Sequence, residues 1–436
     1  MSQRPSTSRL VSLGLAVLLW SGPALSEPLT LEGAEERALA ASPALRIARL
    51  EVAAAKERTS QAWSRHLGDA DLVVLANHFE GARLVRPIAG PLTPATTAAL
   101  PFDANQLHGG LTWQIPLFTG GALLEGDRAA SLLESAARAQ SEHTQAELRY
   151  NVRAAFRNAL NLDHALTAVR GMERALEQSE AAARLRVQAE ASTNVDALKV
   201  GFALASAQAR RAQLETQLRT ARGLLAALMG EEAADFEPTE PPEPALEEPA
   251  PGTADGLQRR DLVSLRTAAE AQTHRAAAVR AGFWPQLAFA GNVFLNAGLE
   301  AAPSAPTFEV SVLLKLPVLA SLGRVPALRE AEAQEGVARE RARARALEVG
   351  TQVLDARGRV EAARAALLAS TSQRTLGAEV ARVEKLKFDA GTGRIEDYLL
   401  ALAQQFDAEA AAWQARYSLQ TALDYLVLAT GTGGSR

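Results

Sequence analysis

Apolar residues recur along most of the chain at alternating spacings of four and three. This rhythm fills two stretches without proline, from Leu117 to Glu237 and after Pro326. A period near 3.5 is typical of coiled coils, in which one apolar stripe stays against a partner helix. The stripe consists of Leu148, Val152, Ala155, Ala159, Leu162, Leu166 and Val169, then Leu204, Ala207, Arg211, Leu214, Leu218, Ala221, Leu225 and Leu228, and in the second stretch Val353, Val360, Leu367, Leu376, Val380 and Val383.

The two stretches predict very long helices over about 121–188 and 323–390. Each is followed by a return helix, over about 194–229 and 394–430. At 1.5 Å rise per residue, such a long helix extends for roughly 100 Å. A helix of this length does not fit inside a globular domain, so it must be a spoke, a fibre or the wall of a tube.

A period of two precedes each long helix and predicts β-strands with one apolar face. Residues 308–318 alternate in this way, and residues 107–117 are their counterpart, with two further strands at about 71–79 and 286–294. The chain thus has four strands in two hairpins, about 71–117 and 286–318, with loops at about 80–106 and 295–307. In the last strand one face is apolar and the other is polar: Phe308, Val310, Val312, Leu314 and Leu316 against Glu309, Ser311 and Lys315.

The two halves of the chain match each other at a fixed offset of 201 residues. The matching pairs are Pro116 and Pro317, Asp196 and Asp397, Leu198 and Leu399, Leu225 and Leu426, and Gly230 and Gly431. Upstream the offset is 218, so the first copy is longer there by 218 − 201 = 17 residues. We assign repeat 1 to 27–230 and repeat 2 to 257–431, each built from a helix, a hairpin, a long helix and a return helix. A Pro- and Glu-rich linker, 231–256, separates them, and 432–436 form a flexible tail.

Residues 1–26 have the pattern of a secretion signal peptide. Arg4 and Arg9 precede an apolar run from Leu10 to Trp20, and small residues suit cleavage before Glu27. The alternative is a membrane anchor, but the run is short for a spanning helix. The formal net charge of −4 becomes −4 − 2 = −6 without the two arginines, which argues against a nucleic-acid partner. There are no cysteines, so packing alone holds the exported chain together.

Four strands form an open sheet with two exposed edges, which the interior of a bilayer does not allow. No later segment is apolar for long enough to be a spanning helix. The mature protein is therefore periplasmic, secreted, or embedded in an outer membrane through its strands. In the last case several copies must join their sheets into a closed barrel.

Two motifs and the duplication resemble the TolC-like outer membrane efflux protein family. The first motif joins strand to long helix, in Ile115-Pro116-Leu117-Phe118-Thr119-Gly120-Gly121 and more loosely from Leu316-Pro317 to Gly323. The second lies at the far end of repeat 2, in Lys387-Phe388-Asp389-Ala390-Gly391-Thr392-Gly393-Arg394-Ile395-Glu396-Asp397-Tyr398-Leu399. The match covers essentially the whole mature chain.

The resemblance implies a mostly α-helical fold with a small β part and no enzymatic activity, cofactor or metal. Three chains would share a twelve-stranded β-barrel in the bacterial outer membrane, and their helices would form a long periplasmic tunnel. The implied partners are two further subunits, outer membrane lipid, a periplasmic adaptor (membrane fusion) protein and an inner-membrane transporter. The duct would serve tripartite efflux or type I secretion, and the sequence does not specify its cargo.

By the same resemblance, segment 391–397 lies at the periplasmic tip, where the tunnel narrows. Gly391 suits a helix C-terminal turn with positive φ, and Asp397 begins the return helix. With its repeat mate Asp196, three chains would place six carboxylates around the opening. Our hypothesis is a cation-favouring ring that also links to donors such as Arg394 and holds the resting tip shut. The simpler interpretation is that each Asp caps a solvated helix.

The chain departs from the family pattern at two tip positions. Glu190 occupies the glycine position in repeat 1, so we expect that turn to be built differently, with Asn194 or Ser192 as the helix cap. Phe388 stands where the family can place a tyrosine, so it can pack but cannot donate a hydrogen bond.

Two other classes of protein compete with the channel. One is a soluble periplasmic coiled-coil adaptor or tether of an export system, which has no need for lipid-facing hairpins. The other is a secreted filament, which the strict two-fold repeat does not favour. The six histidines show no metal-site spacing, and no catalytic or phosphate-binding motif is visible.

Overall fold

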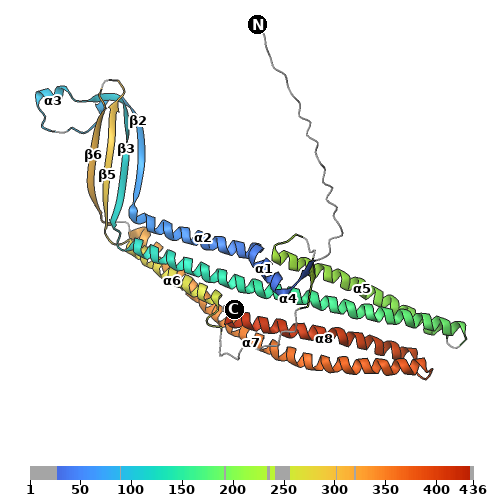
Figure 1. The fold of residues 1–436 in the computed structure, drawn as a ribbon. Coiled ribbons are helices and arrows are strands. Elements are labelled where there is room, and N and C mark those ends of the chain that lie inside the picture. The colour runs from blue at the N-terminus through green and yellow to red at the C-terminus, as the bar shows by residue number, and fades with distance from the viewer. Residues whose placement is uncertain are drawn as a thin grey trace, which may run out of the picture.

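A computed structural model describes residues 27–88, 90–190, 193–232, 236–240, 256–300, 302–318 and 321–432. The predicted signal peptide, most of the linker and the end of the tail lie outside these residues. The molecule is elongated, with a four-stranded sheet at one end and helices that run away from it to a far tip (Figure 1).

Two very long helices form the axis of the molecule. Helix α4 spans Ala122–Gln188 and returns through α5, Asn194–Met229. Helix α7 spans Ser321–Asp389 and returns through α8, Ile395–Thr430. In the half of the molecule toward the sheet, α2 (Pro43–Ser64), a short 3-10 turn (Arg65–Leu67) and α6 (Arg260–Ala281) pack beside them, and α1 (Leu31–Ala41) lies about midway along the molecule (Figure 1).

No helix among the described residues is both long enough and apolar enough to cross a bilayer.

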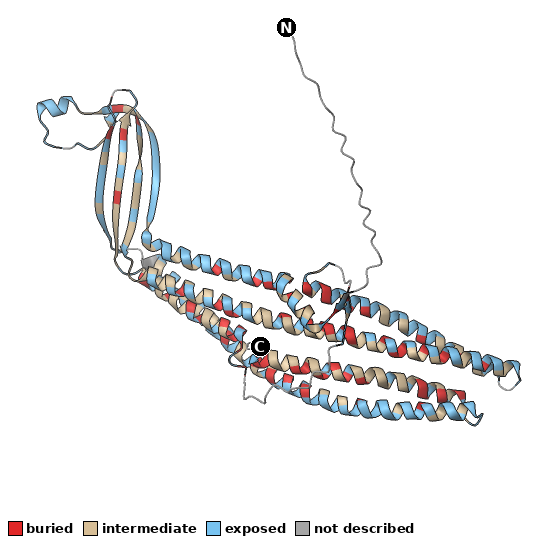
Figure 2. Ribbon diagram, viewed as in Figure 1, coloured by how far each residue is buried: buried red, intermediate tan, exposed pale blue. Residues whose placement is uncertain are grey.

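Most of the predicted apolar stripe is buried between helices (Figure 2). In α4, six of its seven members are buried and Leu162 is partly buried: Leu148, Val152, Ala155, Ala159, Leu166 and Val169. Alanine lets the helix axes approach closely, which suits a thin wall. The prediction is wrong for Leu376 and Val380 of α7, which are 67% and 48% exposed. Val380 instead lines a hollow together with residues of α8.

The sheet has strand order β2-β3-β5-β6, and all neighbours are antiparallel. The strands are β2 (Asp69–Leu84), β3 (Phe102–Phe118), β5 (Gln286–Gly298) and β6 (Ala305–Lys315). Three of them are longer than predicted: β5 extends to Gly298, and β2 and β3 are longer because pairing resumes beyond a bulge, with Arg83 opposite Asp103. The first hairpin loop therefore shortens, and it contains a five-residue helix, α3 (Pro94–Ala98), capped by Thr93 and Thr96. Strand β6 begins and ends three residues earlier than the predicted 308–318.

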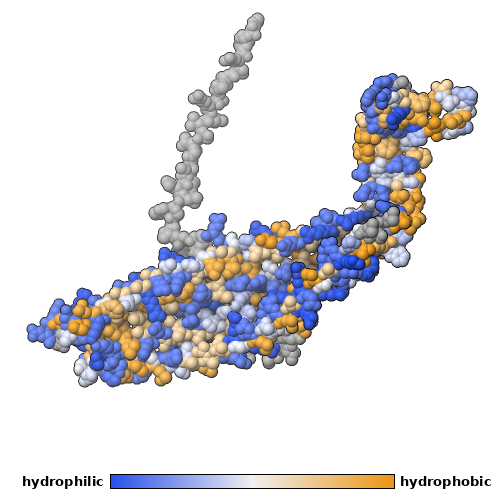
Figure 3. All heavy atoms as spheres, turned by 180° about the vertical axis from the view of Figure 1, so that it is seen from behind, coloured by the Kyte–Doolittle hydropathy of each residue, from blue (hydrophilic) through white to orange (hydrophobic). Residues whose placement is uncertain are grey.

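The register gives this sheet one apolar and one polar face. The apolar face carries, on neighbouring strands, Leu72 and Val74, Leu107 and Leu111, Val293 and Leu295, and Phe308, Val310, Val312 and Leu314. All ten of these side chains are at least 38% exposed. The other face, which we call the polar face, carries Asp69, Asp71, His108, Thr112, Gln114, Asn292, Asn296, Glu309, Ser311 and Lys315, together with the apolar Val73, Leu75 and Leu313. Apolar residues also gather over the sheet in the space-filling view (Figure 3).

A second, two-stranded sheet lies midway along the helices, where β1 (Glu27–Leu29) pairs in parallel with β4 (Phe236–Pro238). Leu29 and Phe236 are both 2% exposed and pack with Phe156 and Met229 in the largest buried cluster. The interpretation of 231–256 as a linker throughout was therefore wrong at its start. Within this Pro- and Glu-rich segment, one aromatic residue, Phe236, is buried against α4 and stabilises strand β4.

Five polar residues, four from helices α4, α6 and α7 and one from the N-cap of α6, meet beside the start of α6. The Asp261 carboxylate accepts hydrogen bonds from Arg259 at 2.7 and 2.9 Å and from Arg345 at 2.8 Å. Arg259 also donates to Gln352 at 2.5 Å, and His143 lies 3.8 Å from the carboxylate. Burial opposes ionisation of Asp261, but the two guanidinium groups outweigh it and hold its pKa well below the usual range. Burial also lowers the pKa of His143.

Candidate functional site at the helical tip

The two turns that close the long helical hairpins lie at the end of the molecule far from the sheet (Figure 1). At the α7–α8 turn, Gly391 adopts φ 75° and its N–H donates to the Phe388 carbonyl at 3.1 Å. The N–H groups of Thr392 and Gly393 both donate to the Lys387 carbonyl at 3.0 Å. These bonds satisfy carbonyls that a helix end leaves unpaired, as in a glycine-terminated helix.

The α4–α5 turn begins in the same way, although it has Glu190 in place of glycine. Glu190 has φ 57°, the left-handed region, and its N–H donates to the Val187 carbonyl at 3.1 Å. The prediction that this turn is built differently is thus wrong at Glu190, since the duplicated backbone is kept at the cost of strain. The predicted cap Asn194 is the first residue of α5 and follows the N-cap Thr193, while Ser192 lies outside the described residues.

Three side-chain contacts join the α4–α5 hairpin to the α7–α8 hairpin at the tip, and we call them the tip contacts. Lys199 of α5 forms an ion pair with Glu396 of α8. The Arg186 guanidinium lies 4.7 Å from the centre of the Phe388 ring and donates to the Phe388 carbonyl at 3.4 Å. The Ser179 and Tyr398 hydroxyls are 3.4 Å apart. These contacts hold the two hairpins together within one chain.

Phe388 and Tyr398 stack at 5.8 Å between ring centres with an angle of 8° between their planes. Tyr398 is 2% exposed and belongs to a buried cluster with Leu176 and Val200, against which Phe388 packs. The hydroxyl that the family can place at position 388 is absent, but Tyr398 brings one to the same contact from the next helix. The tip core is therefore apolar, with the ion pairs around it.

The two aspartates lie in the first turns of the return helices. Asp397 is exposed and Asp196 is half-buried, and the Asp196 N–H donates to the Thr193 carbonyl at 3.1 Å. The expected link from Arg394 to the ring is instead an ion pair with Glu396, at 3.5 Å. The hydrogen bond from Lys199 lowers the pKa of Glu396 to about 2, with a smaller contribution from Arg394. Glu396 thus pairs with two cations of the tip, Lys199 and Arg394, as Asp389 does with Arg186 and Lys385.

Sequence patterns did not identify five residues of the tip contacts: Ser179, Arg186, Lys199, Glu396 and Tyr398. A usable signal was present at the last three, because the repeats differ in residue type there. At the offset of 201, Lys199 corresponds to Leu400, Glu396 to Val195, and Tyr398 to Ala197. Each tip contact joins a residue of one hairpin to a residue of the other. An ion pair needs opposite charges on its two members, so residues that are identical in the two repeats could not form one.

The opposite end of each long helix turns into the sheet. Gly120 and Gly121 have φ of 68° and 91°, and a Cβ at Gly120 would lie 2.5 Å from the Ala281 carbonyl oxygen. Pro116 precedes a bulge in β3. In repeat 2, Pro317 follows β6, but Gly323 is the third residue of α7 and does not form the turn. The second strand-to-helix turn is therefore built differently from the first.

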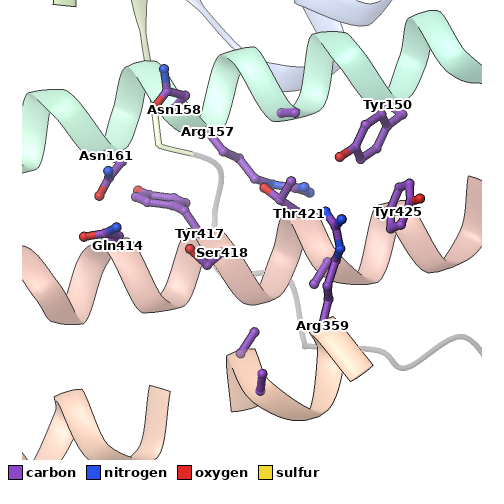
Figure 4. A pocket seen from close by; sticks show the side chains of 14 residues that line it. Tyr150, Arg157, Asn158, Asn161, Arg359, Gln414, Tyr417, Ser418, Thr421 and Tyr425 are labelled. Atoms are coloured by element: carbon purple, nitrogen blue, oxygen red, sulfur yellow. The ribbon is translucent and has the colours of Figure 1, made fainter. Parts of the chain in front are cut away.

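Two hollows of about 490 Å³ each lie along the helices. The first lies between α4, α7 and α8, where Tyr150 and Tyr425 face each other (Figure 4). Its guanidinium groups are engaged, Arg157 with Asp424 and Arg359 with Asp355 at 2.7 Å. The second lies at the tip and is lined by Lys387, Arg394 and Asp397 among others. The tip hollow is thus the one with exposed charges beside the predicted site.

Comparison with known proteins supports the same class. Residues 257–432, which correspond to repeat 2, match the family model described as outer membrane efflux protein. No curated protein matches the chain.

Solved structures extend the likeness to the whole fold. The Campylobacter jejuni CmeC outer membrane channel superposes with a TM-score of 0.82 at 15% identity, covering 99% of this chain and 95% of that one. The outer-membrane channel OprN gives 0.79 at 18% identity, with 93% and 91% covered. The outer membrane protein VceC from Vibrio cholerae gives 0.76 at 18% identity, with 92% and 96% covered.

The fold is therefore that of a TolC-like tunnel and barrel protein, mostly helical with a small sheet. The resemblance to the outer membrane efflux protein family is confirmed, and the match to its family model lies in repeat 2. CmeC and OprN are both described as outer membrane channels.

Proposed function

We propose that this chain is the outer membrane exit duct of a tripartite efflux or type I secretion system. Three copies join their sheets into one twelve-stranded barrel, and their helices enclose a tunnel through the periplasm. A periplasmic adaptor and an inner-membrane transporter deliver the cargo, and the duct conducts it passively. The likeness to CmeC, OprN and VceC supports the class of function, while the assembly is argued from this chain's own surfaces.

The observation that carries the proposal is the exposed apolar face of the sheet. Phe308, Val310, Val312 and Leu314 of β6 are 81%, 56%, 64% and 60% exposed. Burial of apolar surface is worth about 25 cal/mol per Å², so a face of this kind in water is strongly unfavourable. Lipid removes that cost on one face, while the polar face suits a water-filled lumen, as in outer membrane barrels.

Exposed apolar residues on the helices support the trimer. Leu347, Leu354 and Leu368 of α7 recur at multiples of seven and are 69%, 68% and 74% exposed. Such a stripe is a coiled-coil seam that lacks a partner within the described chain. A neighbouring subunit supplies that partner when three copies surround a common axis.

Opening of the tunnel requires the hairpins at the tip to separate, and the tip contacts oppose this. We expect Glu396→Ala to release Lys199 and Arg394, and thus to favour the open state. The measurement is single-channel conductance of purified trimer in a planar bilayer, where open probability should rise severalfold. Glu340→Ala is the matched control, because its ion pair with Arg343 is 3.7 Å long and lies in the exposed middle of α7. Equal open probability in the two variants would contradict a gating role for the tip contacts.

We also propose that Asp196 and Asp397 form a cation-binding ring at the opening. Divalent cations should then block the channel from the tip side, and Asp196→Ala combined with Asp397→Ala should remove the block. If the block is unchanged in the double variant, the two aspartates are only helix-start residues on a solvated surface.

A soluble periplasmic adaptor is the other candidate with similar helices. Membrane fractionation separates the two, since a channel requires detergent for extraction and an adaptor does not. Recovery from the soluble periplasm would refute the channel. Purification in mild detergent, followed by identification of the adaptor and transporter that accompany the protein, then narrows the class of cargo.

A further inference from the structure

The two edge strands of the sheet carry opposite charges on the same face and at the same end. On β2, Asp69 and Asp71 point to the polar face near the helices, and on β6 Lys315 does so. All three side chains are exposed, and none has an ion pair or hydrogen bond to the described part of the chain. One edge is therefore acidic and the other basic, at the point where each strand meets the helical region.

We infer that an ion pair between Lys315 of one subunit and Asp71 of the next fixes the register in which the sheets join. The inference rests on the proposed trimer and goes beyond it, because it names the residues and the strand alignment of the seam. The partner is a second copy of this chain. Its β2 runs antiparallel to the β6 that it meets, as β5 does on the other side of β6.

The register within the chain indicates which residues meet. Following hydrogen-bonded neighbours from Asp69 leads to Gln114, then Ala290, then Ser311. Lys315 lies 315 − 311 = 4 residues beyond that row, so the row shifts by four residues over three steps. The same slope gives a cumulative shift of roughly 5 residues over four steps, the fourth of which crosses from β6 to β2 of the neighbouring copy.

The shift must be even, because an odd one would turn the apolar face of the next sheet inward. A shift of six places Ser311 opposite Leu75 and Lys315 opposite Asp71 of the partner subunit. The same alignment places Leu313 against Val73, and on the apolar face Leu314 against Leu72 and Val312 against Val74. A shift of four instead sets Leu313 against Asp71, and a shift of eight sets Lys315 against Val73. Opposite charges and matched apolar residues on facing strands are the stabilising cross-strand pairs.

The charges also select against the wrong assemblies. Two β2 edges could pair about a two-fold axis, but this would bring the aspartates of both copies together. Two β6 edges would likewise bring two lysines together, and like charges on facing strands are destabilising. An acidic edge that fits only a basic edge gives a head-to-tail contact, which closes into a ring. The seam charges thus favour a closed ring over a dimer.

The absence of cysteine makes the register directly measurable. The variant Asp71→Cys with Lys315→Cys is extracted in detergent and treated with a mild oxidant or a short thiol cross-linker. We expect most subunits to run as covalent trimer on a non-reducing gel, because facing residues bring their Cβ atoms within disulfide reach. Combining Lys315→Cys with Asp69→Cys or Val73→Cys places the two thiols two residues out of the proposed register. The yield of covalent trimer should then fall roughly fivefold or more.

Each outcome decides one point. If the protein without introduced cysteines is monomeric by light scattering, the proposed trimer itself is refuted. A stable trimer that cross-links best at position 69 or 73, or at none of the three, refutes the seam while the trimer stands. Covalent dimers from Asp71→Cys alone would indicate pairing of two β2 edges, and they also refute it.

Charge reversal tests whether the ion pair stabilises the seam. Lys315→Asp and Asp71→Lys should each lower the temperature at which the trimer dissociates, and the combined variant should restore most of the loss. Glu309→Gln, on the same face of β6 but opposite Asn77 in this alignment, is the control and should leave the temperature nearly unchanged. Additive losses in the combined variant would overturn the inference.

Discussion

Removal of the Asp261 carboxylate should be among the most destabilising single changes in the helical region. In Asp261→Ala the Arg259 and Arg345 guanidiniums lose their shared anion. The Arg259 side chain is 5% exposed, so water cannot replace it. Breaking a buried ion pair by removing one partner costs about 3–5 kcal/mol, since an uncompensated charge stays in the interior.

The neighbouring residue provides a matched control. Arg260 forms an ion pair with Glu142 at 2.9 Å, but these side chains are 59% and 54% exposed. Exposed ion pairs of this kind contribute about 0–1 kcal/mol. Glu142→Ala therefore removes the carboxylate that pairs with the residue next to Asp261, from an ion pair of similar length, at little expected cost.

The assay is thermal unfolding of the detergent-solubilised protein, followed by circular dichroism. For a chain of this length, each kcal/mol corresponds to roughly 1–2 °C, so Asp261→Ala should lower the Tm by about 3–10 °C. Glu142→Ala should lower it by about 2 °C or less. Equal shifts in the two variants would refute the reasoning from burial.

The pH dependence of the same difference is a second test. Because the pKa of Asp261 is depressed in the folded state, its contribution is complete above its ordinary value of 3.8. It is lost as the pH falls from there toward the folded-state pKa. The Tm difference between wild type and Asp261→Ala should thus not shrink as the pH falls from 8 to 5. A difference that shrinks between pH 7 and 5 would contradict the strong depression of this pKa.

Three further predictions concern single positions. Gly120→Ala should destabilise the strand-to-helix turn, because its φ is 68° and a Cβ would lie 2.5 Å from the Ala281 carbonyl oxygen, whereas Gly323→Ala inside α7 meets open space and should raise the Tm slightly. Glu190→Gly should stabilise the tip by about 1 kcal/mol, as a left-handed residue without a Cβ carries no strain, and slower hydrogen exchange at that turn would register it. His143→Gln should reduce the loss of stability as the pH falls below 6.5. Burial lowers the pKa of His143 in the folded protein, so folding opposes its protonation and the free energy of unfolding decreases at low pH. An unchanged Tm–pH profile would count against this.

The long helices could be predicted because their signal is repeated over many turns. The predicted ends of α4 and α7 lie within two residues of those in the structure, since the 3.5-residue period and the absence of proline act along the whole span. The strands were less well defined. Residues 80–84 carry Glu, Gly and Arg, which read as loop, and only the pairing of Leu84 with Phe102 across a bulge makes them strand.

The tip and the buried charges depend on which surfaces meet, and no local pattern encodes this. Periodicity placed Asp196 and Asp397 at helix starts but could not reveal that Lys199 reaches Glu396 on the other hairpin. The contact of Asp261 with Arg345 joins residues 84 positions apart in sequence. In the same way, Leu376 and Val380 fit the heptad pattern, but the sequence does not show whether their packing partner belongs to the same chain or to another copy.

The parallel pairing of β1 with β4 imposes an order on folding. Glu27 lies opposite Phe236, so 236 − 27 = 209 residues separate two facing positions. During export, the first strand must wait until all of repeat 1 and the start of the following segment have crossed the inner membrane. Such non-local contacts form late because loop closure must come first. This small sheet can therefore form only after the whole first repeat has crossed the inner membrane. Until then Leu29 stays exposed and can be bound by chaperones that recognise exposed apolar segments.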